Sequence, residues 1–299
     1  MPKRADKSLN PELQSEELLT FRRQIDTMDE QIIQLLKDRA QVVQQVGAYK
    51  TSQGQQHCFI RPGREADMLR HIWQQFDGEA FSQVAAAAMW RLIIGASTNI
   101  EHTLNISVYA PEGDPTLSWL AREYFGPFCP VTRHPNARRV LGDVIDGKAG
   151  VGILPPVQDE TQGDWWLVLA EQGDAAPKLF AHVPFVTHSN EARRHSSYAV
   201  AHVQPEPTED DITLIAVQTT DVSLNRLITA FSTARFKAAR LQYSEPDAQN
   251  HTWHLLRVEG FIDSADERLA NLFAPMKEGV ANWHVLGSYA SPILTKDVS

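Results

Sequence analysis

Residues 16–50 form one uninterrupted amphipathic pattern, which constrains the fold more than any other feature of the chain. Apolar residues recur at spacings of three and four, which predicts a long helix with a single apolar stripe. The stripe consists of Leu18, Phe21, Ile25, Met28, Ile32, Leu35, Leu36, Val42, Val43 and Val46. Arg39 and Lys50 lie on it too, because eleven residues at about 100° each bring the helix back to within about 20°. We therefore expect both cations to face one interior, roughly 16 Å apart along the helix axis.

These two cations predict an anionic partner from outside the helix. An unpaired charge is costly to bury, and none of the helix's own acids lies on the stripe. The alternative is that Arg39 and Lys50 keep their stems in the core and extend their charged ends into water. Arg22 precedes Arg39 by seventeen residues and lies about 100° off the stripe. We expect it to serve a different cavity or a partner chain.

The composition is that of a soluble protein with two or three domains. The 299 residues are 42% hydrophobic and 22% charged, and the formal net charge of −9 argues against a nucleic-acid partner. The start MPKRADKSLN has no apolar signal segment, and no run approaches the length of a membrane span. Cys58 and Cys129 lie far apart without a CxxC motif, so we expect no disulfide framework and no metal site. A cytoplasmic protein is the default expectation.

The pattern of elements divides the chain into a helical region followed by two regions that mix helices and strands. Pro62 suits the first position of a second helix, and a third helix is expected over residues 81–102. We expect a loose tail at residues 1–14, an all-helical domain at 15–104, a small α/β lobe at 105–204, a proline-rich acidic linker at 205–210 and a βαββαβ domain at 211–299.

The third helix can complete a site for the two cations. Ser97 and Glu101 lie on the same side of it as Trp90 and Ile94, so that side begins apolar and ends polar. Taken alone, Ser97 is more often a packing residue, and both Glu101 and Glu65 are more often solvated acids near helix ends. One region nevertheless combines Arg22, Arg39, Lys50, Arg64, Glu65, Ser97 and Glu101.

With these residues at these spacings, the helical region resembles the all-helical chorismate mutases, and more closely the mutase domain of bifunctional chorismate mutase–prephenate dehydratases. The similarity covers residues 15–104. It implies an intertwined three-helix homodimer whose two active sites each take an arginine from the partner chain. It also implies conversion of chorismate to prephenate without a cofactor. The matching text is Leu18–Asp26, Met28-Asp29-Glu30, Leu35-Leu36 through Arg39, Val46–Lys50, Arg64-Glu65, and Leu92-Ile93-Ile94 with Ser97 and Glu101.

The family's chemistry implies a role for each cation of the site. Arg39 and the partner's Arg22 would each bind a carboxylate of chorismate, because a guanidinium contacts a carboxylate at two points. Holding both carboxylates would keep the reacting carbons close together. Lys50 and Glu101 would donate hydrogen bonds to the ether oxygen, on which negative charge grows as the C–O bond breaks.

The remaining implied roles concern binding, and two positions depart from the family. Ser97 would contact a carboxylate, Glu65 would accept a hydrogen bond from the ring hydroxyl, and Arg64 would tune the site. Several relatives have aspartate where this chain has Arg61, so at Arg61 the backbone would make the hydroxyl contact. Many relatives have glutamine in place of Glu101. A carboxyl group donates only when it is protonated, so we expect catalytic efficiency to fall as the pH rises.

The next region resembles the dehydratase of the bifunctional enzymes in a degenerate form. Residues 106–113 are similar to its opening strand and glycine turn, and residues 156–163 occupy the place of its Pro-Ile-Glu-Asn motif. Its catalytic Thr-Arg-Phe triplet aligns with Ser196-Ser197-Tyr198. About a hundred residues suit one lobe, whereas the dehydratase needs two. We therefore expect no dehydratase activity.

The last region resembles a ferredoxin-like ACT domain. It ends in Val285-Leu286-Gly287-Ser288-Tyr289 as the dehydratases do, but residues 222–224 and 242–245 lack the phenylalanine-binding segments of that family. A scaffold or dimerisation role is the expectation. The resemblance as a whole predicts a chorismate mutase in aromatic amino acid synthesis. Two alternatives are a related enzyme acting on aminodeoxychorismate or isochorismate, and a regulatory metabolite-binding protein with an idle mutase domain.

Overall fold

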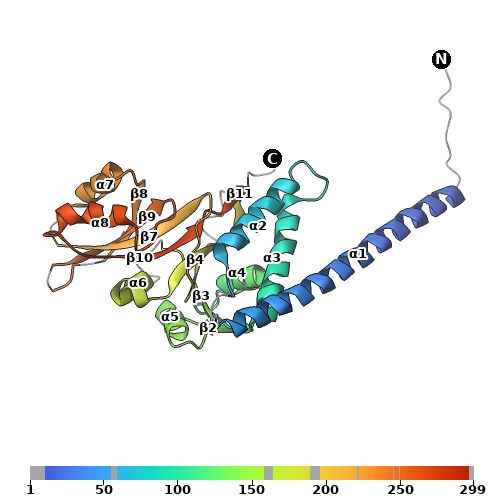
Figure 1. The fold of residues 1–299 in the computed structure, drawn as a ribbon, viewed down its shortest axis with the longest axis horizontal. Helices are drawn as coiled ribbons and strands as arrows, with labels where there is room; N and C mark the ends of the chain where they lie inside the picture. The colour runs from blue at the N-terminus through green and yellow to red at the C-terminus, as the bar shows by residue number, and fades with distance from the viewer. Residues whose placement is uncertain are drawn as a thin grey trace, which may run out of the picture.

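The computed structural model describes residues 11–54, 59–157, 164–188, 196–220, 222–244, 246–248 and 250–295, and in these a helical region is followed by a large sheet (Figure 1). The helices are α1 (Pro11–Ser52), α2 (Pro62–Gln75), α3 (Gln83–Glu101), α4 (Thr116–Phe125), α5 (Ala137–Ile145), α6 (Trp165–Gln172), α7 (Leu224–Thr233) and α8 (Glu267–Phe273), with short 3-10 helices at Gly173–Ala175 and Ala274–Met276. The strands are β1 (Ile106–Tyr109), β2 (Val131–His134), β3 (Val151–Leu154), β4 (Lys178–Val183), β5 (Val186–His188), β6 (Ser197–Ala201), β7 (Asp211–Thr219), β8 (Ala238–Tyr243), β9 (Thr252–Glu259), β10 (Val280–Ala290) and β11 (Ile293–Thr295). None of the described helices is long and apolar enough to cross a membrane.

Helix α1 projects away from the rest of the protein and contacts it only near its C-terminal end (Figure 1). Its 42 residues confirm the predicted long helix, which begins at Pro11, within the tail expected over residues 1–14. The expectation that the stripe faces an interior is wrong for most of its length in the single chain: apart from the half-buried Val43, the stripe residues and their apolar neighbours Leu19 and Ile33 are between 41% and 67% exposed. These exposed residues of α1 are Leu18, Leu19, Phe21, Ile25, Met28, Ile32, Ile33, Leu35, Leu36, Val42 and Val46. Burial begins only where α3 covers α1.

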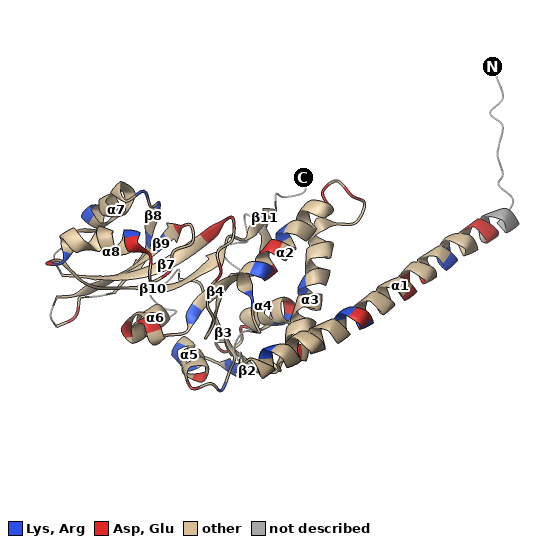
Figure 2. Ribbon diagram, viewed as in Figure 1, with Lys and Arg blue, Asp and Glu red and all other residues tan. Residues whose placement is uncertain are grey.

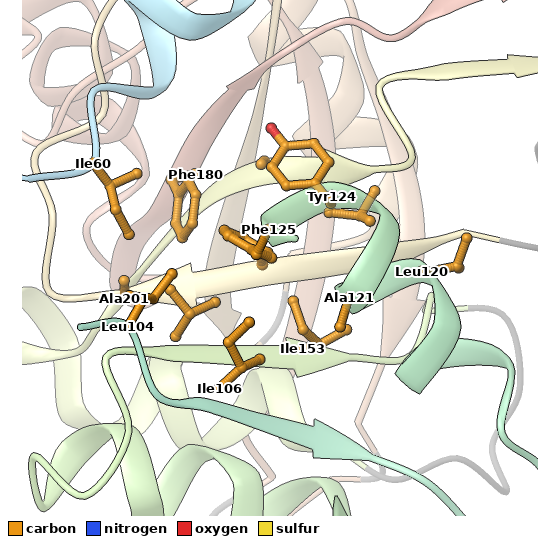
Figure 3. Close-up of a cluster of buried hydrophobic side chains, with 14 of the residues drawn as sticks. Ile60, Leu104, Ile106, Leu120, Ala121, Tyr124, Phe125, Ile153, Phe180 and Ala201 are labelled. Carbon is orange, nitrogen blue, oxygen red and sulfur yellow. The ribbon is translucent and has the colours of Figure 1, made fainter. Parts of the chain in front are cut away.

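Helices α2 and α3 share a hydrophobic core with the region that follows them. Leu69 of α2 and Ile94 of α3 belong to the same buried cluster as Leu120 and Phe125 of α4 and Phe180 of β4. Figure 3 shows part of this cluster, with α4 side chains meeting residues of β1, β3 and β4. The helical region is therefore packed onto the sheet region through a common core.

The sheet has nine strands in the order β2-β1-β3-β6-β4-β10-β7-β9-β8. Strands β2, β1 and β3 are parallel, and β6 runs antiparallel to both β3 and β4. The two α/β regions, expected as separate units, meet in this one sheet where Gly287 of β10 pairs with Leu179 of β4. Any side chain at Gly287 would overlap the Leu179 backbone, and its φ of 149° also favours glycine.

The C-terminal region has the predicted βαββαβ order, which forms strands β10-β7-β9-β8 with α7 and α8 on one face. This element order is that of ferredoxin-like units. Helix α6 packs on the other face, where Trp165 and Trp166 are almost completely buried (Figure 1). Both faces of this part of the sheet are thus covered, which explains the continuous burial along β7.

The sequence patterns do not predict one α-helix and four strands of the structure: α6, β2, β4, β5 and β11. Helix α6 begins with the apolar run Trp165–Ala170, which has no helical period because the helix is buried on most sides. Strand β2 is a half-exposed edge strand, and β5 and β11 have three residues each. Of the two cysteines, Cys129 is a buried free thiol, and Cys58 lies outside the described residues.

Candidate active site

The candidate site forms where α1 crosses α3. Gly47 is buried at this crossing, and a Cβ there would lie 3.3 Å from the Cα of Glu101. This close approach places Arg39 and Lys50, which are about three helical turns apart on α1, opposite Ser97 and Glu101 of α3. The crossing therefore brings together all four of the residues that the sequence placed on the facing sides of these helices.

Arg39 forms the first contact of the site, because its Nη1 donates a hydrogen bond to Ser97 Oγ. Ser97 in turn donates to the Ile93 carbonyl oxygen at 2.6 Å. Burial and the nearby positive charge of Arg64 lower the pKa of Arg39. A half-buried guanidinium whose charge is disfavoured by burial and by a second cation nearby is a group that a bound anion would stabilise.

Lys50 forms the second contact, an ion pair with Glu101 in which Nζ lies 2.6 Å from Oε2. Both side chains are largely buried, at 14% and 12% exposure. The ammonium group also lies 5.6 Å from the ring centroid of Phe59, whose ring stacks on His102. The counter-charge for Lys50 is thus supplied by α3 of the same chain, and Glu101 accepts the hydrogen bond.

Glu65 has a partner that the sequence did not suggest. Arg91 of α3 donates from Nη2 to Glu65 Oε2 at 2.7 Å, and both side chains are buried. The Arg91 guanidinium lies 4.1 Å from the centroid of the Tyr124 ring on α4. The available signal was a single cation within the otherwise apolar run Met89–Ile94.

Arg61 is directed away from the site. Its Nε donates to Glu206 Oε1, while its backbone N–H reaches Glu65 Oε1 at 3.4 Å. The second Glu206 oxygen accepts from the backbone N–H of Arg64 at 3.4 Å, so a carboxylate caps the positive end of α2. Glu206 holds the Arg61 side chain and the Arg61 backbone N–H is the group next to Glu65, so a backbone contact of Arg61 to the substrate stays a prediction.

Residues of the predicted linker 205–210 also contact α2 farther along the helix. Arg70 of α2 donates to Thr208 Oγ1 at 2.9 Å and to the Asp210 carbonyl oxygen at 2.7 Å. Glu206 packs so tightly on Gly63 that a Cβ there would approach it to 2.6 Å. The helix that carries Arg64 and Glu65 is in this way fixed to the sheet region.

Arg22 lies far from these residues on the projecting part of α1. At 1.5 Å per residue, it is about 25 Å along the helix from Arg39. Its side chain is exposed, and Figure 2 shows charged residues of both signs spaced along α1 with uncharged turns between them. The chain's own Arg22 therefore cannot reach the site at Arg39.

The triplet aligned with the dehydratase lies inside the sheet. Ser196, Ser197 and Tyr198 are buried, and Ser197 Oγ donates to the Val183 carbonyl oxygen. Tyr198 packs against the Tyr289 ring, and burial raises its pKa. These side chains serve packing, whereas residues 158–163 of the other dehydratase-like segment lie outside the described residues. No three His, Cys, Asp or Glu side chains of the described ranges are grouped to hold a metal ion.

Comparison with known proteins identifies the helical region. The family model described as chorismate mutase type II matches residues 21–102. The bifunctional chorismate mutase/prephenate dehydratase of Pseudomonas aeruginosa is 30% identical over 151 residues, which are 50% of this chain and 40% of that protein. The protein of the same description from Aquifex aeolicus is 29% identical over 151 residues, covering 50% of this chain and 41% of its own. The matched part thus spans about two-fifths of the length of these relatives.

Among solved structures, the prephenate dehydratase of Streptococcus mutans aligns with 65% of this chain and 100% of its own, with 15% identity and a TM-score of 0.45. A likeness of this degree says nothing about activity. The match of the helical region is of a different kind, because it coincides with the helices that carry Arg39, Lys50, Glu65, Ser97 and Glu101. Residues 21–102 form a chorismate mutase type II domain, in a chain homologous to the bifunctional chorismate mutase/prephenate dehydratases.

Proposed function

We propose that the protein is a chorismate mutase, which rearranges chorismate to prephenate in aromatic amino acid synthesis. The observation that carries this proposal is the pairing of Arg39 with Ser97 and of Lys50 with Glu101 at one helix crossing. Chorismate is a dianion, and the site combines cations with a hydroxyl group in a half-buried place. A dianionic substrate would supply negative charge beside Arg39, whose own charge is disfavoured by burial and by the nearby Arg64.

The reaction breaks one C–O bond and forms one C–C bond within a single molecule. The protein therefore has to hold the substrate in its compact conformer and stabilise the charge that develops on the ether oxygen. Arg39 and Ser97 would bind one carboxylate and Lys50 the ether oxygen. Glu65 would accept the hydrogen bond of the ring hydroxyl, with the adjacent Arg61 backbone N–H at 3.4 Å from its Oε1.

Glu101 needs a change of partner in this scheme. In the free chain it accepts a hydrogen bond from Lys50, whereas beside the ether oxygen it would have to donate one. As a carboxylate it would repel the growing negative charge, so the active form is the protonated acid. A fall in catalytic efficiency at rising pH follows from this requirement.

The active unit is proposed to be a homodimer. Single exposed apolar residues are normal on a monomer, but the exposed apolar residues of α1 form one continuous stripe, which is typical of an interaction surface. Helix α3 adds four more exposed apolar residues, Val84, Met89, Leu92 and Ile100. A second copy packed along α1 would cover both sets. It would also bring the partner's Arg22 to the site, which the chain's own Arg22 cannot reach.

The rest of the chain is proposed to have no dehydratase activity. Two observations support this proposal. The residues at the Thr-Arg-Phe position are buried in the sheet, and the described strands β1, β2, β3, β4 and β6 of the region all belong to that one sheet. The βαββαβ region is proposed to be an ACT-like scaffold. A regulatory protein with an idle mutase domain is disfavoured, because an idle site has no need for the half-buried cations Arg39 and Lys50.

The test is the loss of chorismate's diene absorbance in the presence of the purified full-length protein. Lys50→Ala should lower turnover by about 100-fold or more, because removing one donor to a developing oxyanion costs about 3–4 kcal/mol. Lys237→Ala is the control, since Lys237 forms an exposed ion pair with Glu259 at 3.1 Å in the C-terminal region. A wild-type protein that leaves chorismate unchanged, or a folded Lys50→Ala variant with normal turnover, would refute the proposal.

A further inference from the structure

The buried pair of Glu65 and Arg91 links helices α2 and α3 to the α/β region. Glu65 lies on α2 and Arg91 on α3, and the Arg91 guanidinium lies over the ring of Tyr124, which belongs to α4. The side chains of Glu65 and Arg91 are 11% and 8% exposed. Three helices thus contribute one member each to a buried chain of contacts that ends at a residue of the proposed site.

Arg91 depends strongly on Glu65 for its stability in this place. Glu65 is the carboxylate that the described residues bring within 4 Å of the guanidinium, and the Nε and Nη1 atoms of Arg91 have no hydrogen-bond acceptor among those residues. Burial opposes the charge of Arg91, but attraction to Glu65 and Tyr124 outweighs it and raises the pKa of the guanidinium. A buried ion of this kind holds its partner firmly, because separating the two leaves an uncompensated charge.

The two oxygens of Glu65 are used differently. Oε2 accepts the hydrogen bond from Arg91, and Oε1 lies beside the backbone N–H of Arg61. Without Arg91, the carboxylate could rotate and either oxygen could take either place. With Arg91, the orientation is defined by a short charge-assisted hydrogen bond.

We propose that Arg91 is a positioning residue for the mutase reaction, which fixes Glu65 so that Oε1 is presented to the ring hydroxyl of the substrate, and that Tyr124 of α4 holds Arg91 in place. This inference rests on the proposed function and extends it to a residue outside the binding set. It also gives the α/β region a part in the mutase site.

The packing between α3 and α4 makes this support rigid. A Cβ at Gly95 would lie 2.5 Å from the Phe125 carbonyl oxygen, so the two helices touch through their backbones. Tyr124 and Phe125 also belong to the core that α2 and α3 share with the sheet (Figure 3). A movement of Arg91 would therefore require repacking of this core.

The test is a double-mutant cycle on the full-length protein, with Arg91→Gln, Glu65→Gln and the double variant. If Arg91 acts through Glu65, Arg91→Gln should lower kcat/KM for chorismate about tenfold or more in the wild-type background but less than about threefold in the Glu65→Gln background. A merely structural role would lower kcat/KM by the same factor in both backgrounds, and that result would overturn the proposal. Thermal unfolding of each variant monitors the fold.

Further variants test the proposal if Arg91→Gln does not fold. Arg91→Lys keeps a positive charge next to Glu65, so its kcat/KM should lie closer to the wild-type value than that of Arg91→Gln. The remaining loss of kcat/KM caused by Arg91→Lys should again disappear in the Glu65→Gln background. Tyr124→Leu should lower kcat/KM several-fold, whereas the matched control Tyr243→Leu, which removes a ring 4.8 Å from the Arg240 guanidinium at the far sheet edge, should not. Equal effects of the two tyrosine variants would overturn the role of Tyr124. A wild type without chorismate turnover refutes the proposed function, whereas an active wild type without coupling refutes this inference alone.

Discussion

Sharing of the active site between two chains can be tested by mixing two inactive variants. Arg22→Ala and Arg39→Ala should each lose about 100-fold or more in turnover, since each removes a charge-assisted contact to the substrate. Arg22 and Arg39 of one chain lie about 25 Å apart along α1, more than any arginine side chain can span. If the sites are shared, a mixed dimer contains one site with Arg39 from one chain and Arg22 from the other, and a second site that lacks both.

The expected recovery follows from this arrangement. Random re-association makes half of the dimers mixed, and one of the two sites in each mixed dimer is complete, so turnover should return to about a quarter of the wild-type value. The assay is chorismate consumption after the two variants are denatured, mixed and refolded, with mixed dimers verified by mass.

The matched negative control is a mixture of Arg39→Ala and Lys50→Ala. Both residues belong to the same half of a site, because α1 of one chain places them together against α3. No mixed dimer of these two variants contains a complete site, so turnover should stay at the level of the parents. Verified mixed dimers of Arg22→Ala and Arg39→Ala that remain equally inactive would show that Arg22 does not act across the dimer.

Three further predictions concern the second activity, the pH dependence of catalysis and the pH dependence of stability. Purified protein given prephenate at neutral pH should form no phenylpyruvate above the buffer background, and saturable formation would show a working dehydratase. Glu101→Gln should flatten the decline of kcat/KM at rising pH because an amide donates a hydrogen bond at any pH; identical rate profiles for both proteins would exclude Glu101 as the donor. Burial lowers the pKa of His182, which packs against Tyr289, so the folded chain keeps it neutral while the unfolded chain binds a proton below pH of about 6.5. The contribution of neutral His182 to stability is complete above that pH and is lost as the pH falls. His182→Phe should therefore reduce the slope of the free energy of unfolding against pH by at most about 1.4 kcal/mol per pH unit. Denaturant titrations between pH 7 and 5 that give the same slope for both proteins would contradict this.

The sequence alone was enough to locate the candidate site residues that lie at regular helical spacings. Arg39 and Lys50 share a face because of the period of one helix, and Ser97 and Glu101 share a face for the same reason. The structure confirms that these faces meet. The βαββαβ order of the C-terminal region is likewise confirmed, because its strands and helices carry local hydrophobic patterns.

Only the tertiary structure reveals contacts between residues that no local period relates. Arg91 lies 26 residues from Glu65, and Glu206 lies 145 residues from Arg61. Both contacts depend on how α2 packs against α3 and against the sheet region, so neither is visible in the residue pattern of a single helix.

The exposure of the stripe on α1 has the same physical origin. An apolar stripe shows that a helix has a side to bury, but the pattern is identical whether the covering surface belongs to the same chain or to another. The sequence determined which residues of α1 need cover and which helices carry the site. The packing of helices and strands decided that one chain leaves most of the stripe bare, that a single sheet unites the two later regions, and that Glu65 is held by Arg91.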